Sequence, residues 1–255
     1  MIELKTPTEI EAMRRAGRVV AQALAAVQKH AEVGSSLLDL DEVAREVLTA
    51  EGATSPFLDY LPAFAPTPFP AVICASVNDV IVHGIPDGYR LRDGDLVSID
   101  CGAGIDGWYG DAAVSFVVGT PRAADLVMID TARRALAAAI EVAVVGNRLG
   151  DIAHAVGSVC RAGGYGIPAD FGGHGIGRAM HEAPSVANEG RPGRGPTLRA
   201  GLVLAIEPML IGGGRDDYLV GPDGWALSTA DGSRAAHVEH TVAVTEAGPQ
   251  LLTGR

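Results

Sequence analysis

Apolar residues recur with a helical period in four stretches of the chain. In residues 8–30, Ile10 and Met13 belong to a series that returns to one face about once per turn, which is the pattern of an amphipathic helix. Thr6 or Thr8 can cap the start of this helix, because a hydroxyl there accepts a hydrogen bond from a free backbone N–H. Three more helices are predicted at residues 37–51, 121–146 and 149–163.

Shorter apolar runs lie between the helices and predict strands. A strand is expected at residues 71–77, a hairpin at about 95–118, and further strands near 202–211, 224–229 and 235–245. Residues 54–70 contain five prolines and are expected to form a loop, whereas residues 164–200 are rich in glycine and proline.

The order of these elements is helices, strands, helices, strands. This order favours the α+β class with a mostly antiparallel sheet. No change in composition marks a linker, so residues 1–255 are expected to form a single domain.

The predicted hairpin carries two aspartates around a turn. Asp106-Gly107 is a strong signal for a two-residue turn, because that turn needs a positive φ at both positions. Asp100 then lies opposite Ala113, and Asp111 projects from the same face as its diagonal neighbour. Two carboxylates in one space repel each other unless a cation lies between them. The spacing therefore indicates a metal site, and the alternative is that both aspartates end strands and face water.

Further histidines and glutamates stand in unusual surroundings. Glu207 lies inside an apolar run, where an unpaired carboxylate is costly to bury, and His174 stands among glycines. Each one alone is more often a structural group than a ligand. Together with the two aspartates they form a set dominated by oxygen donors, which suits a pair of Mn, Fe, Co or Zn ions. The residues that stand out in this way are His83, His174, His181, Glu207 and Glu239.

Composition narrows the classes of partner. The net charge is −11 and no run of Lys or Arg occurs, so nucleic acid is not expected as a direct partner. The first residues lack a signal-peptide pattern, and no stretch reaches the roughly 18 apolar residues that a membrane span needs. Three scattered cysteines without a CxxC pair fit a reducing compartment. We therefore expect a cytoplasmic protein that does not bind membranes.

Motifs across nearly the whole chain resemble one family, the type I methionine aminopeptidases. They are the Asp100/Asp111 hairpin and the segments 78–86, 173–178, 206–209 and 238–241. The resemblance implies the pita-bread fold, in which an antiparallel sheet is backed by two pairs of helices in two pseudo-symmetric halves. It also implies two divalent metal ions, which are Co, Mn, Fe or Zn.

The resemblance assigns the metal ligands residue by residue. Asp100 would be a terminal ligand of one ion, and Asp111 and Glu239 would bridge both ions. His174 and Glu207 would complete the coordination of the other ion. Glu207 would also accept a proton from the bridging water.

The resemblance assigns other residues to the substrate. His83 would contact the amide that is cleaved, and His181 would bond near its carbonyl. His237 shares a face with Glu239, and a structural role is favoured for it. The residues that would enclose the methionine side chain are Phe69, Cys74, Met180 and Trp225.

The implied reaction is removal of the N-terminal methionine from nascent proteins when the second residue is small, by attack of a metal-bridging hydroxide. The family's Tyr-His-Gly-Tyr-Pro motif is replaced here in residues 57–70, with about six inserted residues and without its histidine. An aminopeptidase or dipeptidase specialised on another peptide is therefore an alternative, and a non-catalytic peptide-binding homologue is a third. A monomer is expected; the resemblance also implies contact with the ribosome, although no basic patch supports it.

Overall fold

The computed structural model describes residues 2–254, and its helices are the four that the apolar pattern predicts. The first two begin with capping boxes, in which Thr6 pairs with Glu9 and Ser36 pairs with Asp39. These reciprocal hydrogen bonds satisfy backbone N–H groups that have no partner within the helix. The helices are α1 (Pro7–His30), α2 (Leu37–Ala50), α3 (Ala123–Glu141) and α4 (Leu149–Ala162).

The third helix is shorter than predicted. The expected range of 121–146 was too long at its C-terminal end, because α3 stops at Glu141. The side chain of Asn147 donates a hydrogen bond to the carbonyl of Val142 at 2.8 Å. The chain then turns back toward α4 through Gly146, which has φ of +94°. The apolar pattern overestimated the length of the helix because Ala143, which lies beyond its end, is also buried in the core.

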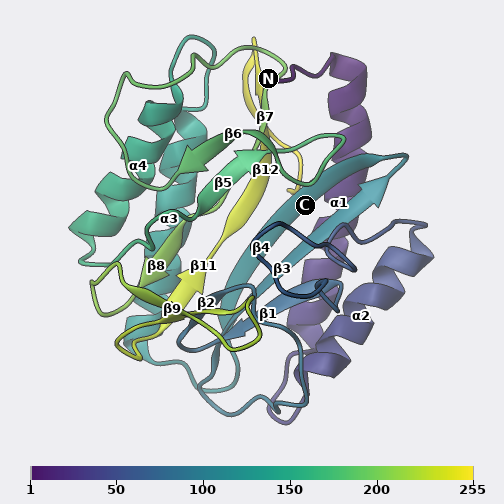
Figure 1. Ribbon diagram of the computed structural model, residues 1–255, viewed down its shortest axis with the longest axis vertical. Helices are drawn as coiled ribbons and strands as arrows, with labels where there is room; N and C mark the ends of the chain where they lie inside the picture. Colours follow the sequence, from purple (N-terminus) through teal and green to yellow (C-terminus); the bar gives the residue numbers. More distant parts are fainter. Residues whose placement is uncertain (1, 255) are drawn as a thin grey trace.

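One curled antiparallel sheet forms the centre of the molecule (Figure 1). Its strands follow the order β1-β3-β4-β12-β7-β5-β6, and β13 pairs with β12. The strands are β1 (Ile73–Val77), β3 (Leu96–Ile105), β4 (Trp108–Val117), β5 (Gly172–Gly175), β6 (Glu182–Ala187), β7 (Val203–Ile206), β12 (Glu239–Thr245) and β13 (Gly248–Leu251).

The remaining strands form two smaller sheets. One has the order β2-β10-β9, and the other pairs β11 with β8. The predicted strands at 202–211 and 235–245 are each divided, the first at Glu207-Pro208 and the second at Val238. Proline has no N–H for the ladder. These strands are β2 (Val80–Val82), β8 (Met209–Ile211), β9 (Tyr218–Val220), β10 (Leu227–Thr229) and β11 (Ala235–His237).

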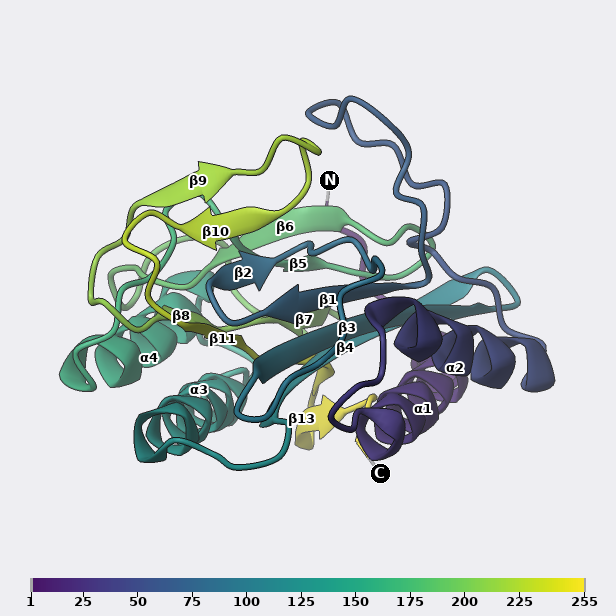
Figure 2. The ribbon, with the colours of Figure 1, turned by 90° about the horizontal axis from the view of Figure 1, so that it is seen from below.

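The helices cover one face of the sheet in two pairs (Figure 2). Two buried apolar clusters reflect this pairing: residues of α1 and α2 pack with β1, β3 and β4, and residues of α3 and α4 pack with β7 and β12. The opposite face carries the β2-β10-β9 sheet and the segment between α2 and β1 (Figure 2). The predicted α+β class with an antiparallel sheet and two helix pairs is confirmed. Within residues 2–254, no helix combines the length and apolarity that a bilayer span requires.

Candidate metal and substrate site

The hairpin of β3 and β4 has the register that the sequence predicts. Asp106 and Gly107 have φ of 52° and 73° and form the turn. Asp100 is paired with Ala113, and Asp111 is paired with Gly102. Both carboxylates therefore lie on the same face of the sheet, and both line one pocket.

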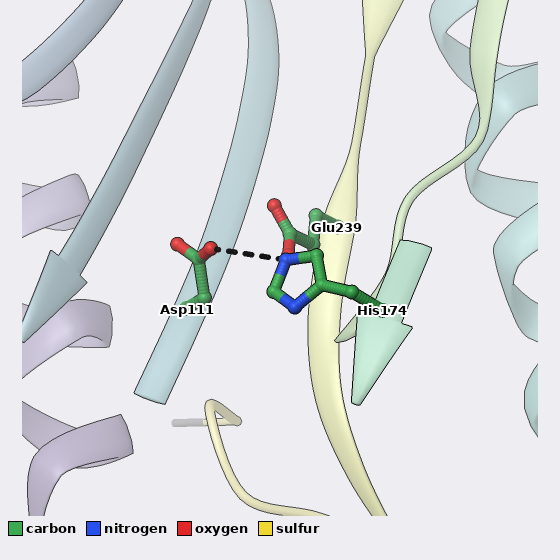
Figure 3. Close-up of side chains that lie close together, drawn as sticks. All are labelled: Asp111, His174 and Glu239. Carbon is green, nitrogen blue, oxygen red and sulfur yellow. Dashed lines mark ion pairs between the residues drawn. The ribbon is translucent and has the colours of Figure 1, made fainter. Parts of the chain in front are cut away.

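Neighbouring strands bring two further groups to Asp111. Glu239 is paired with Ala113 across β4 and β12, while His174 lies on β5, two strands away from β12. One ligand atom from each of Asp111, His174 and Glu239 lies within 4.8 Å of the others. Figure 3 shows the three side chains converging, with His174 Nε2 3.9 Å from Asp111 Oδ2. This spacing suits a group that could hold a metal ion.

A second group of possible ligands shares Glu239. It consists of Glu207, His237 and Glu239, with ligand atoms again within 4.8 Å of one another. The two oxygens of Glu207 face different imidazoles: Oε1 lies 3.8 Å from His174 Nε2, and Oε2 lies 3.4 Å from His237 Nε2. The sequence analysis favoured a structural role for His237 and did not include it in the site. The alternation of residues 237 and 239 on one face was the signal that pointed to it.

Several buried carboxylate oxygens in this cluster have no hydrogen-bond partner among the described residues: Asp100 Oδ1, Asp111 Oδ1 and Glu239 Oε1. Burial raises the pKa of Asp100 to about 6. Burial, together with the neighbouring carboxylates, raises the pKa of Asp111 and Glu239 well above their ordinary values. Unpaired buried carboxylates are costly, so the cluster is suited to receive cations.

Glu207 differs electrostatically from the other carboxylates. Burial raises its pKa, but the neighbouring imidazoles of His237, His174 and His83 outweigh burial and hold the pKa below its ordinary value. Its backbone carbonyl accepts a hydrogen bond from the side chain of Asn188 at 2.9 Å. The backbone of Glu207 is thus held in place, and its carboxylate is ionised at neutral pH.

His83 and His181 lie beside the cluster. The centroid of the His181 ring is 4.3 Å from that of His174, and the Tyr60 ring stacks on His181 with a centroid distance of 5.3 Å. His83 has φ of 60°, a conformation that a non-glycine residue adopts at a cost. Burial lowers the pKa of both His83 and His181 to about 4. Both imidazoles are therefore neutral near pH 7.

A pocket of about 710 Å³ opens over the cluster. All the ligand and substrate residues that the sequence analysis selected line this pocket, and so do the aromatic rings of Phe57, Tyr60, Phe64 and Phe171. Phe57, Phe64 and Phe171 were missed, because an isolated aromatic residue in a loop carries no periodic signal. The selected residues in the lining are Phe69, Cys74, His83, Asp100, Asp111, His174, Met180, His181, Glu207, Trp225 and Glu239.

The loop of residues 60–69 rises beside this pocket. Its neck is closed by hydrogen bonds from Asp59 N to the Phe69 carbonyl and from Phe69 N to the Tyr60 carbonyl, at 2.8 and 2.9 Å. The indole N–H of Trp225 donates to the carbonyl of Thr67 at 3.0 Å. Phe64 is 64% exposed, and its ring lies 5.6 Å from that of Trp225. The loop is thus an ordered part of the pocket rim.

The glycine before His174 allows close packing of two strands. A side chain at Gly173 would lie 2.1 Å from the backbone carbonyl oxygen of Ala205 in β7. Glycine permits this close packing of strands, which brings His174 to the carboxylates.

Known proteins share both the sequence and the fold. Residues 11–246 match metallopeptidase family M24. Methionine aminopeptidase 1 of Mycobacterium tuberculosis is 51% identical over 99% of this chain and 95% of its own length. The crystal structure of methionine aminopeptidase from Thermotoga maritima is 39% identical, with a TM-score of 0.95 over 100% of both chains.

A more distant structure shares the fold alone. Prolidase from Pyrococcus furiosus is 23% identical, with a TM-score of 0.79 over 99% of this chain and 65% of that one. The pita-bread fold that the sequence motifs imply is confirmed by these structures. Because the family match spans most of the chain and the mycobacterial relative aligns with nearly all of it, the chain belongs to metallopeptidase family M24.

Proposed function

We propose that this metallopeptidase removes the N-terminal methionine of newly made proteins whose second residue is small. The observation that carries the proposal is a largely apolar pocket that opens directly over a cluster of buried carboxylates. Relatives that match along nearly the whole chain bear the name methionine aminopeptidase. We place the reaction in the cytoplasm, where N-terminal peptides of nascent proteins are the substrate.

Two divalent ions are the cofactor in this proposal. Asp100, Asp111 and Glu239 would share them with His174 and Glu207. The unpartnered oxygens of Asp100, Asp111 and Glu239 fit this role, and the four negative charges of the carboxylates balance two divalent cations. When bound, such ions polarise a carbonyl and lower the pKa of water to near neutrality.

The two neutral histidines act on the substrate. A neutral imidazole has one N–H donor and one acceptor nitrogen. His181 would donate to the scissile carbonyl and His83 would bond the amide that is cleaved. Because burial keeps both pKa values near 4, this arrangement persists across the neutral range.

Glu207 is the proton acceptor of the proposed mechanism. It is ionised because the surrounding imidazoles hold its pKa below the ordinary value. It would take a proton from the attacking water and return it to the leaving amine. General acid–base transfer of this kind contributes about 10²–10⁴-fold to a rate.

The methionine side chain would occupy the apolar part of the pocket. Phe69, Cys74, Met180 and Trp225 are buried and belong to one apolar cluster. The ring of Phe69 lies 5.1 Å from that of Trp225. An unbranched thioether fits such a surface, because sulfur contacts with aromatic rings are favourable.

One observation favours a second candidate, an aminopeptidase specialised on another peptide. The loop of residues 60–69 adds the exposed ring of Phe64 to the rim of the pocket. Residues of the substrate beyond the first would pass this rim. A specialised enzyme would therefore select its peptide through the loop.

Hydrolysis of a tripeptide panel tests both candidates. The panel varies the first residue in Xaa-Ala-Ser and the second in Met-Xaa-Ser, with metal content controlled. We expect a strong preference for methionine first and a small residue second. Hydrolysis without a preference for methionine would contradict the leading proposal and favour the specialised enzyme.

A further inference from the structure

One buried side chain beneath the carboxylate cluster has no role so far. His237 is 2% exposed and is absent from the lining of the pocket, although its Nε2 lies 3.4 Å from Glu207 Oε2 and 3.9 Å from Glu239 Oε2. Its Nε2 has no hydrogen-bond partner among the described residues. A buried polar nitrogen without a partner is rare and calls for a physical reason.

The backbone of His237 is held firmly. Its N–H lies 3.0 Å from Ser115 Oγ, and its carbonyl accepts a hydrogen bond from the same hydroxyl at 2.7 Å. Ser98 Oγ lies 2.7 Å from Ser115 Oγ, so the contact extends to both strands of the aspartate hairpin. The backbone of His237 is thus anchored to the strands that carry Asp100 and Asp111.

The same strand break that places Glu207 also places His237. β8 begins after Glu207-Pro208, and β11 pairs with it so that His237 lies opposite Met209. At the end of this ladder, the backbone N–H of Val238 donates a hydrogen bond to the carbonyl of Pro208 at 3.3 Å. Glu207 and His237 therefore face each other across a fixed register.

We propose that His237 is a positioning residue, whose Nε2–H closes the 3.4 Å gap to Glu207 Oε2 and donates to it once the metal site above is filled. Its place outside the pocket lining favours this role over that of a metal ligand. Carboxylates that bind metals are commonly held by a second hydrogen bond of this kind, and its loss costs about 10–100-fold in metal affinity or activity.

Metal binding by His237 variants tests the proposal. The kinetic readout of this inference rests on the proposed function, because it needs a peptide substrate. The metal affinity does not, because it is measured without a peptide. His237→Gln keeps an N–H donor, whereas His237→Leu removes it. We expect calorimetric Mn²⁺ affinity to fall about 10–100-fold in His237→Leu and to be largely retained in His237→Gln.

The matched control is His240→Gln. His240 lies on β12, where its Nδ1 contacts Thr253 Oγ1 at 2.8 Å, and it is not part of the pocket lining. This variant should bind Mn²⁺ like the parent. Thermal unfolding and circular dichroism confirm that each variant is folded before affinities are compared.

Coupling with Glu207 separates positioning from packing. If His237 acts through Glu207, His237→Leu should lower kcat with little change in KM, and it should have no further effect in a Glu207→Gln background. Additive effects in this double-mutant cycle would overturn the proposal. Parent-like Mn²⁺ affinity in His237→Leu would also overturn it.

X-ray absorption on the Co²⁺-loaded protein tests the competing role. If His237 only positions Glu207, the imidazole scattering of the parent persists in His237→Gln. His174 supplies one imidazole in either case, so a decrease in the number of coordinated imidazoles in that variant would make His237 a ligand and overturn the proposal. A parent without methionine preference would instead contradict the proposed function and leave these metal readouts unaffected.

Discussion

The carboxylate cluster and the loop beside it are held in different ways. Asp100, Asp111 and Glu239 lie on strands of the central sheet, and the ladder sets their spacing. The loop of residues 60–69 is joined to the rest of the molecule at its neck and through Trp225. A change in the sheet would move several ligands together, whereas a change in the loop would leave the sheet intact. The carboxylate cluster and the rim of the pocket are therefore held by separate contacts.

Asp111→Asn should have the largest effect. The amide lacks the negative charge that holds two cations together, so we expect little or no activity, a loss larger than the roughly 10⁴-fold upper range of a single acid–base contact. The fold should persist, because the amide is close in size and the ladder is unchanged. Turnover at limiting Mn²⁺ and circular dichroism provide the two measurements. Near-parental turnover would contradict the assignment of Asp111 as a ligand.

His181→Ala and His83→Ala should come next. Each removes a hydrogen bond to the substrate, so we expect kcat/KM to fall by about 10²–10⁴-fold. Both variants should keep their metal, which elemental analysis can measure. A variant that loses metal would show that its histidine is a ligand.

Phe64→Ala should have a smaller and selective effect. An apolar contact in a pocket is worth about 1–3 kcal/mol of discrimination, and Phe64 is exposed, so we expect the low end of this range. The change should appear in kcat/KM ratios across Met-Ala-Xaa peptides that differ in their third residue. Leu38→Ala is a control, since Leu38 is an exposed apolar residue of α2 that is not in the pocket lining.

Replacing residues 61–68 with His-Gly extends this test. The shortened loop should shift selectivity toward that of ordinary relatives and leave metal affinity unchanged. If the parent and the shortened variant have the same peptide profile, the insertion has no bearing on specificity.

The smallest effect concerns the stability of the metal-free protein. Burial raises the pKa of Asp100 from 3.8 to about 6, so the folded state binds more protons than the unfolded state in this interval. The contribution of Asp100 to stability is therefore lost as pH rises from about 4 through 6. Relative to the parent, Asp100→Asn should gain about 1 kcal/mol more at pH 7.5 than at pH 5, which is roughly 2–4 °C in Tm.

Thermal unfolding of both proteins in chelator measures this difference. His83 and His181 have lowered pKa values, so they make the folded state more stable as pH rises. This contribution is present in both proteins and cancels when the two are compared. Added Mn²⁺ should reverse the order of stability, because Asp100 then contributes a ligand charge. An equal gain at both pH values would contradict the raised pKa.

Local sequence determined the parts of the site that depend on short-range rules. Asp106-Gly107 selects the turn, the turn sets the register of β3 and β4, and the register aims Asp100 and Asp111 at one space. Of the two threonines that could cap the first helix, Thr6 does so through a capping box. These predictions succeed because each rests on interactions within a few residues along the chain.

Other parts were decided only by contacts between distant segments. The strands at 172–175 and 182–187 depend on glycines that allow close packing against neighbouring strands. His237 lies against Glu207 because the two residues flank the same end of the β8–β11 ladder, although they are 30 positions apart in the sequence. Apolar period and local propensity carry no information about such pairings. The tertiary structure alone decided that the imidazole of His237 lies against Glu207 and that the ring of Phe64 reaches the pocket rim.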